Sequence, residues 1–142
     1  MPTYVLDSGA ILCTLFNEEG ANIVTDLLLR AQSGGEEDGA EVLVPFIALM
    51  ETEYVLRRRV RSSDAERALL RVENWPILIR ESSAAWRHEA ARLKALGGVS
   101  LADAWIAALA LMEGAEVVHR DPELDRVPGL KSLRLPDRSR RA

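Results

Sequence analysis

The sequence predicts an α/β fold, a three-layer α/β/α sandwich around a mainly parallel central sheet. Short apolar runs of strand length alternate with longer segments that have helical periodicity. The chain has 142 residues, of which 48% are hydrophobic, enough for one domain with a sizeable core. Because no repeat and no internal linker divides it, we expect a single domain over residues 1–135.

The first half of the chain supplies two expected strands and three expected helices. The stretch SGGEEDGA (residues 33–40) is rich in glycine and acids and predicts a loop. Pro45 suits the first turn of a helix, where its missing N–H is not needed. The expected elements are a strand over Tyr4–Leu6, helices over Ser8–Phe16 and Glu18–Gln32, a strand over Glu41–Val44 and a helix from Pro45 to about Val60.

The second half continues the alternation. Ser63-Asp64-Ala65-Glu66 resembles a capping box and predicts the start of a helix that ends near Trp75. The elements expected after it are a strand over Pro76–Ile79, helices over Ser83–Leu96 and Ser100–Glu113, a strand over Glu116–Val118 and a fifth strand over Ser132–Leu135. The basic tail, residues 136–142, is expected to be disordered and is left out of the domain.

Composition limits the classes of function. The net charge of −4 argues against a passive nucleic-acid binder, which is usually basic, but not against a metal-dependent nuclease whose acids form the site. No apolar run reaches the length of a membrane span, and the start MPTYVLD lacks the features of a signal peptide. The single cysteine, Cys13, has apolar neighbours and no partner for a disulfide or zinc site. We therefore expect a buried thiol and a cytoplasmic protein.

Two acids follow predicted strands. Asp7 comes directly after the first strand, and Asp121 lies a few residues after Val117-Val118. In open α/β sheets, ligands bind beyond the carboxyl ends of the strands, so the two acids would meet if their strands are neighbours. Each also has an alternative role. Asp7 could be a helix N-cap, worth about 1 kcal/mol, and Asp121-Pro122 could simply open a turn.

Asp103 is the only charged residue from Val99 to Met112. Apolar residues surround it on every side of the helical wheel, and a helix that is apolar all round is buried. An acid in such a helix is costly unless it is paired or bound to metal. The alternative is a capping box with Ser100, and the two roles are compatible.

On the helix after Pro45, two glutamates compete for a role in the site. Glu51 falls within an apolar stripe formed by Ile47, Ala48, Tyr54 and Val55. Glu53 instead has a local partner, Arg57, four residues on, which is typical of a surface pair. The helical wheel favours Glu51 without deciding the choice.

Acids brought together in one place need a cation. Two unit charges about 4 Å apart repel by on the order of 4 kcal/mol at an effective dielectric constant of about 20. Carboxylate ligands suit hard cations such as Mg²⁺ or Mn²⁺, which can activate water and neutralise a phosphate. No Ser-His-Asp or Cys-His arrangement competes. His88 is expected at the surface, and His119 could contact a substrate beside Asp121.

Four segments resemble the PIN-domain nucleases, especially the VapC-type toxins of toxin–antitoxin pairs. They are YVLDSGAIL (residues 4–12), VPFIALMETEYVLRR (44–58), VSLADAWIAALAL (99–111) and VVHRDPELDRVPGL (117–130). The resemblance implies a metal-dependent ribonuclease that uses Mg²⁺ or Mn²⁺. It further implies an RNA substrate, a homodimer and a small antitoxin that blocks the site.

The resemblance also implies the site residues. The four acids of the family fall on Asp7, Glu51, Asp103 and Asp121, which settles the choice over Glu53. A further acid often follows the fourth, and Glu123 matches it, with Asp125 as another candidate. Two positions depart from the family pattern: His119 stands where a threonine is frequent, and Leu124 where an aromatic is frequent. These departures concern substrate positioning more than metal binding.

Basic residues near the end of the same helix have two interpretations. They could guide a phosphate backbone or pair with an acidic antitoxin segment, or they could be a solvated helix end favoured by the helix dipole. The residues are Arg57, Arg58, Arg59 and Arg61.

Two other functions remain alternatives. One is a structure-specific DNA nuclease of the same fold, although the chain is short for the extra elements of such enzymes. The other is a non-enzymatic, receiver-like signalling module. Receiver domains depend on a lysine near the end of the sheet, whereas Lys94 and Lys131 are the only lysines here and neither follows an apolar strand.

Overall fold

The computed structural model describes residues 1–34 and 38–136, and the strands in that part of the chain form one parallel sheet. These strands are β1 (Thr3–Leu6), β2 (Glu41–Pro45), β3 (Leu78–Arg80), β4 (Glu116–His119) and β5 (Lys131–Arg134). Their order is β3-β2-β1-β4-β5, and every neighbouring pair is parallel. The chain builds the sheet outward from β1 and then returns to its other side. The order therefore reverses between β1 and β4, where ligands of such sheets bind.

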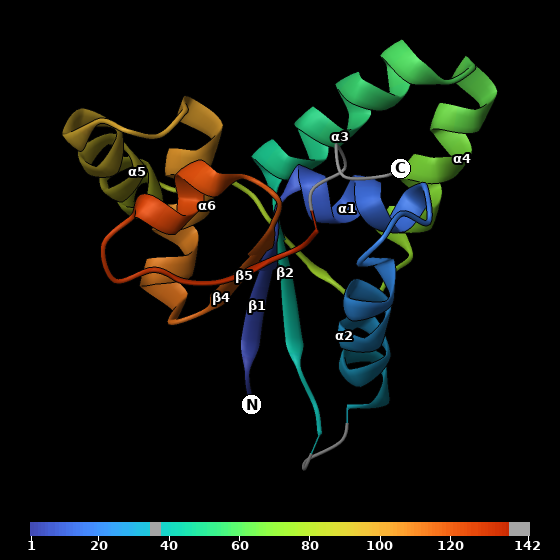
Figure 1. Cartoon of the computed structure of the whole chain (residues 1–142), viewed down its shortest axis with the longest axis horizontal. Coiled ribbons are helices and arrows are strands. Elements are labelled where there is room, and N and C mark those ends of the chain that lie inside the picture. Colours follow the sequence, from blue (N-terminus) through green and yellow to red (C-terminus); the bar gives the residue numbers. More distant parts are fainter. Residues whose placement is uncertain (35–37, 137–142) are drawn as a thin grey trace.

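Helices cover both faces of the sheet (Figure 1). They are α1 (Ser8–Leu15), α2 (Ala21–Ser33), α3 (Phe46–Arg59), α4 (Ser62–Glu73), α5 (Ala84–Leu96), α6 (Leu101–Glu113) and the short 3₁₀ helix η1 (Pro122–Arg126). Val5 and Val117 face a core that includes residues of α5 and α6, whereas Leu6 and Val118 face one that includes α1 and α2. This alternation along parallel strands confirms the predicted three-layer sandwich.

Several predicted boundaries were wrong because local backbone geometry overrides the sequence pattern. α2 begins at Ala21 rather than at Glu18, since Gly20 adopts φ 99° before it. The capping box predicted at Ser63 is absent: α4 begins at Ser62 and its N-cap, Arg61, makes no side-chain cap bond. Strand β3 begins at Leu78 rather than at Pro76, whose missing N–H cannot join a strand ladder.

Pro45 and the fifth strand also differ in detail. Pro45 is the last residue of β2 and the N-cap of α3, so it precedes the first helical turn instead of lying in it. The fifth strand exists, but it covers Lys131–Arg134, one residue earlier than predicted. Of the tail expected to be disordered, residues 137–142 lie outside the described residues. The single-domain division at residue 135 stays a prediction.

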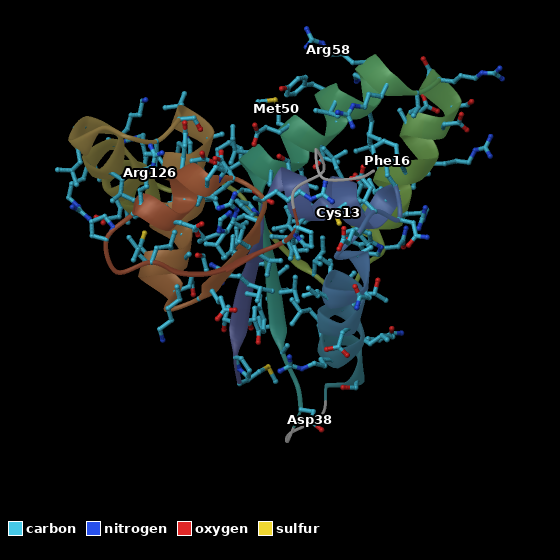
Figure 2. All side chains as sticks on the ribbon, viewed as in Figure 1. Cys13, Phe16, Asp38, Met50, Arg58 and Arg126 are labelled. Atoms are coloured by element: carbon cyan, nitrogen blue, oxygen red, sulfur yellow. The ribbon has the colours of Figure 1, made fainter. Side chains whose placement is uncertain are left out.

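Two further expectations concern the surface and the interior. Cys13 is fully buried, as predicted, and Figure 2 shows it inside the fold on α1. The same view shows Met50 and Arg58 on α3 pointing away from the sheet. Among the described residues, no helix combines the length and apolar character needed to cross a membrane.

Candidate metal centre at the carboxyl edge of the sheet

Asp7 lies where β1 passes into α1, and two sets of bonds fix it. Its Oδ1 accepts a hydrogen bond from the Ala10 N–H at 2.8 Å, so it is the N-cap of α1. Its own N–H donates to the Val118 carbonyl of β4 at 3.2 Å. The cap role expected as an alternative is therefore real, and it places a buried carboxylate at the reversal point of the sheet.

Asp103 and Asp121 reach the same place from α6 and η1. Ser100 caps α6, and its Oγ accepts the Asp103 N–H at 3.1 Å, which puts Asp103 in the first turn. Asp121 caps η1 and accepts the Glu123 N–H at 2.9 Å. Asp103, Asp121 and Glu123 each offer a carboxylate oxygen, and these atoms lie within 4.8 Å of one another.

Glu51 completes the group from α3. It is half-buried, and the Ser8 hydroxyl donates to its Oε1 at 3.4 Å. Glu53 instead forms an exposed ion pair with Arg57 at 2.8 Å, as its spacing predicted. The geometry thus brings Glu51, and not Glu53, to the other acids.

All four predicted acids line one cavity of about 250 Å³. Its walls come from the ends of β1 and β4 and from three helices. The lining residues are Asp7, Ser8, Gly9, Glu51, Ser100, Asp103, Ile106, Arg120 and Asp121. In the part of the chain that the structure describes, no ion pair neutralises any of these four carboxylates.

The electrostatics of the cavity disfavour negative charge. Burial raises the pKa of Asp7 to about 7, with further contributions from the charges of Glu51 and Asp121. Hydrogen bonds from the main-chain N–H groups of Ala10 and Arg120 oppose this rise. Burial, followed by the adjacent Asp121 carboxyl and its charge, raises the pKa of Asp103 to about 8. Burial also raises the pKa of Glu51. Without a cation, the site holds protons near neutral pH.

These residues fit a divalent cation. Asp103 Oδ2 is buried and has no hydrogen-bond partner among the described residues. A buried carboxylate oxygen without a partner is unfavourable unless a ligand satisfies it. The available donors are carboxylates, which hard cations such as Mg²⁺ and Mn²⁺ prefer. The site therefore has the chemistry of a centre for a hard divalent cation.

The two candidates for a fifth acid separate clearly. Glu123 lies with Asp103 and Asp121, whereas Asp125 Oδ1 is 3.1 Å from His119 Nε2 and accepts the Ser132 hydroxyl at 2.8 Å. His119 is fully buried and is not part of the cavity wall, so its expected contact with substrate finds no support. Glu123 and Asp125 are two residues apart in a 3₁₀ turn, which directs their side chains to different partners. Their spacing in the sequence alone could not show these directions.

One charged residue in the cavity wall was missed by the sequence interpretation. Arg120 follows β4 and forms an ion pair with Glu18 at 2.8 Å, across 102 positions of sequence. The only available signal was an arginine next to a candidate acid. Its partner lies in a distant turn, and only the folded topology brings the two together.

Solved structures show the same fold at low sequence identity. VapBC2 from Rickettsia felis, bound to a DNA fragment from its promoter, has a TM-score of 0.76 at 17% identity and covers 94% of this chain and 99% of its own. VapC20 from Mycobacterium tuberculosis, described as a sarcin–ricin-loop-cleaving toxin, has a TM-score of 0.68 at 16% identity, covering 92% and 98%. FitAcB from Neisseria gonorrhoeae has 0.60 at 19%, covering 91% and 95%.

Sequence comparison adds the family. Among curated proteins, no sequence matches the chain significantly. The family model of the PIN domain matches residues 4–130, which include all four acids of the cavity. This match spans nearly the whole chain, and the chain therefore belongs to the PIN-domain family.

Proposed function

We propose that the chain is a hydrolase, a metal-dependent endoribonuclease, and the toxin of a VapBC-type toxin–antitoxin pair. One observation carries the proposal. Asp7, Glu51, Asp103 and Asp121 come from four separate parts of the chain and meet in one cavity, and no ion pair within the described residues neutralises them, since Arg120 in the cavity wall is paired with Glu18. Such a site attracts divalent metal and, through it, a phosphodiester.

In this proposal the four acids, with Glu123, hold Mg²⁺ or Mn²⁺. When bound, the metal would supply positive charge against the attacked phosphate and lower the pKa of a water. The chain prepares the ligands beforehand. The Ala10 N–H orients Asp7, the Ser8 hydroxyl orients Glu51, and the Glu123 N–H orients Asp121. Asp103 Oδ2, which has no hydrogen-bond partner among the described residues, remains available to the metal.

The partners of the proposed toxin are an RNA substrate, an antitoxin and a second copy of the chain. Arg58 and Arg59 lie exposed at the end of the helix that carries Glu51, where they could contact an RNA backbone. A groove of about 420 Å³ at α3 and α4, which combines the exposed Met50 and Tyr54 with charged residues such as Glu53, suits a protein partner. Cytoplasmic location is part of the same proposal, because RNA and a reduced Cys13 belong there.

The test is cleavage of single-stranded RNA by purified protein with Mg²⁺ or Mn²⁺. We expect cleavage that excess chelator abolishes and that Asp7→Asn or Asp103→Asn removes while the circular dichroism spectrum is retained. Undiminished cleavage in chelator would refute the metal mechanism. The molar mass from light scattering tests the homodimer. Co-purification with the product of an adjacent short reading frame tests the antitoxin partner.

The two alternatives give different results. Preferential cleavage of flap DNA over single-stranded RNA would favour the structure-specific DNA nuclease. A receiver-like module would accept phosphate from a small phosphodonor. The geometry argues against it, because Lys94 donates to the Val99 carbonyl and no lysine lines the acidic cavity in the described part of the chain.

A further inference from the structure

The Glu18–Arg120 ion pair lies beside the acidic cavity and joins two distant turns. Glu18 is in the turn between α1 and α2, and Arg120 is in the turn between β4 and η1. Arg120 Nη1 donates to Glu18 Oε1 at 2.8 Å, and Nη2 donates to the Glu19 carbonyl at 3.4 Å. The side chains are only 13% and 5% exposed. This is a largely buried charge pair, and its Arg120 is part of the cavity wall.

Such a pair is poorly explained by stability alone. Two buried charges lose their hydration, and apolar residues of similar size often stabilise a fold as well or better. The turn that carries Glu18 is already held by the main chain: the Glu18 N–H donates to the Cys13 carbonyl at 2.9 Å, and the Ala21 N–H donates to the Glu18 carbonyl at 3.0 Å. Glu18 is therefore a fixed anchor to which Arg120 is attached.

What Arg120 carries is part of the site. Its main-chain N–H lies close enough to Asp7 to lower the pKa of that carboxyl, and the next residue is Asp121. A Cβ placed on Gly9 of α1 would lie only 3.4 Å from the Cβ of Arg120, so α1 packs closely on Arg120. A movement of Arg120 would therefore move two of the four carboxylates relative to each other.

From this geometry we propose that the Glu18–Arg120 pair is a positioning device of the acidic site, which keeps Asp7 and Asp121 at the spacing a shared metal requires. The inference depends on the proposed metal site for its purpose. Arg120 acts through Asp7 and Asp121 and is not itself a catalytic residue. Both terminal nitrogens of its guanidinium are bonded to the turn that precedes α2.

The test compares Mn²⁺ affinity, measured by calorimetry, in Arg120→Met, Arg120→Lys, Glu18→Gln and wild type. Outer partners of metal ligands typically change affinity by about 10- to 100-fold, and we expect Arg120→Met and Glu18→Gln both to weaken binding within that range. Arg120→Lys, which keeps a charge for Glu18, should recover part of the loss. The matched control is Arg80→Met, which breaks the partly exposed Arg80–Glu113 pair away from the cavity and should leave affinity unchanged.

The sign of the effect separates positioning from simple charge. Removing a cation beside four acids should strengthen Mn²⁺ binding if Arg120 acts only through its field. Positioning predicts weaker binding for Arg120→Met and Glu18→Gln alike, although the two variants change net charge in opposite directions. Unchanged or tighter Mn²⁺ binding by Arg120→Met, with a raised KM for RNA, would overturn the inference and make Arg120 a substrate contact.

A metal-free measurement keeps this inference distinct from the proposed function. The Glu123 N–H donates to Asp121 Oδ1, so its hydrogen exchange reports whether the β4–η1 turn is held. We expect faster exchange there in Glu18→Gln. This variant keeps the size of the side chain, so it provides the test even if Arg120→Met fails to fold. Normal exchange in Glu18→Gln would overturn the inference even if wild type binds Mn²⁺ and cuts RNA. A wild type that binds no Mn²⁺ would overturn the proposed function and, with it, the stated purpose of the pair.

Discussion

Acidic side chains gather in two adjoining regions of the molecule, and their surroundings differ. In the acidic cavity, carboxylates face one another, and their pKa values rise. In the flank beside it, acids have basic partners from the same chain. The buried Glu18 contacts Arg120 at 2.8 Å, and the exposed Asp125 lies 3.6 Å from Arg134.

The difference identifies which acids have a structural role and which await a ligand. Desolvation of a charge is unfavourable both for the cavity acids and for the buried Glu18, but Arg120 offsets it for Glu18. In the cavity nothing in the described chain does so, and Asp103 Oδ2 has no hydrogen-bond partner. Unbalanced negative charge, more than the number of acids, is therefore the observation that supports the proposed metal site.

The largest expected effect comes from two glutamates two residues apart on α3. Glu51→Gln removes an acid of the cavity, and we expect RNA cleavage to fall by about two to three orders of magnitude, as for loss of one group that stabilises developing charge. Glu53→Gln breaks only an exposed pair with Arg57, so cleavage should remain within about twofold. Initial rates under saturating Mn²⁺ measure both.

These two matched variants test directly whether the cavity acids differ in role from acids outside the cavity. Both changes are isosteric and lie on the same helix, so any effect common to both reports on α3 as a whole. Equal losses in the two variants would mean that the position of an acid relative to the cavity does not matter. Melting temperatures, expected to differ little from wild type, exclude unfolding as the cause.

A second effect, in stability, follows from the raised pKa values of Asp7, about 7, and Asp103, about 8. Between roughly pH 4 and 8 the folded protein holds protons that the unfolded chain has released. The free energy of unfolding of the metal-free protein therefore decreases as pH rises through this window. Asp103→Asn removes one such group and should stabilise the metal-free protein at pH 8, with a smaller gain at pH 5.

Urea unfolding in chelator at pH 5 and pH 8 measures this. The difference between wild type and Asp103→Asn isolates one carboxyl, because other groups such as His119 contribute to both proteins. Added Mn²⁺ should stabilise wild type more at pH 8 than at pH 5, since it must displace protons. A variant less stable than wild type at pH 8 in chelator would show that Asp103 is compensated within the chain.

How far the sequence predicted the molecule depends on the range of the interactions. The sheet, its helices and Asp103 were predictable because apolar periodicity and a lone acid in an apolar helix are local signals. The capping box at Ser63 and the start of α2 were wrong because the entry of the chain into each helix depends on backbone geometry at Arg61 and Gly20.

The site shows the same division. Asp7 was predictable from the strand that it follows, and Glu51 needed the family pattern to be chosen over Glu53. Arg120 could not be connected with Glu18 across 102 residues, because only the parallel order of β1 and β4 brings their turns together. The orientations of Glu123 and Asp125 were set by the 3₁₀ turn η1, whose side-chain directions the sequence did not reveal.

The smallest expected effect compares these last two acids. Glu123→Gln removes an oxygen that lies within 4.8 Å of ligand oxygens of Asp103 and Asp121, and Mn²⁺ affinity should fall about tenfold, near the lower end of the range for groups around a metal. Asp125→Asn instead removes the charge near His119 and Arg134. It should lower thermal stability modestly and leave Mn²⁺ affinity within about twofold, because its contacts point away from the cavity. Calorimetry measures the Mn²⁺ affinity of both variants, and thermal melts measure their stability. If Asp125→Asn weakens Mn²⁺ binding as much as Glu123→Gln does, the flank and the cavity are one electrostatic unit, and the distinction between compensated and uncompensated acids fails at this turn.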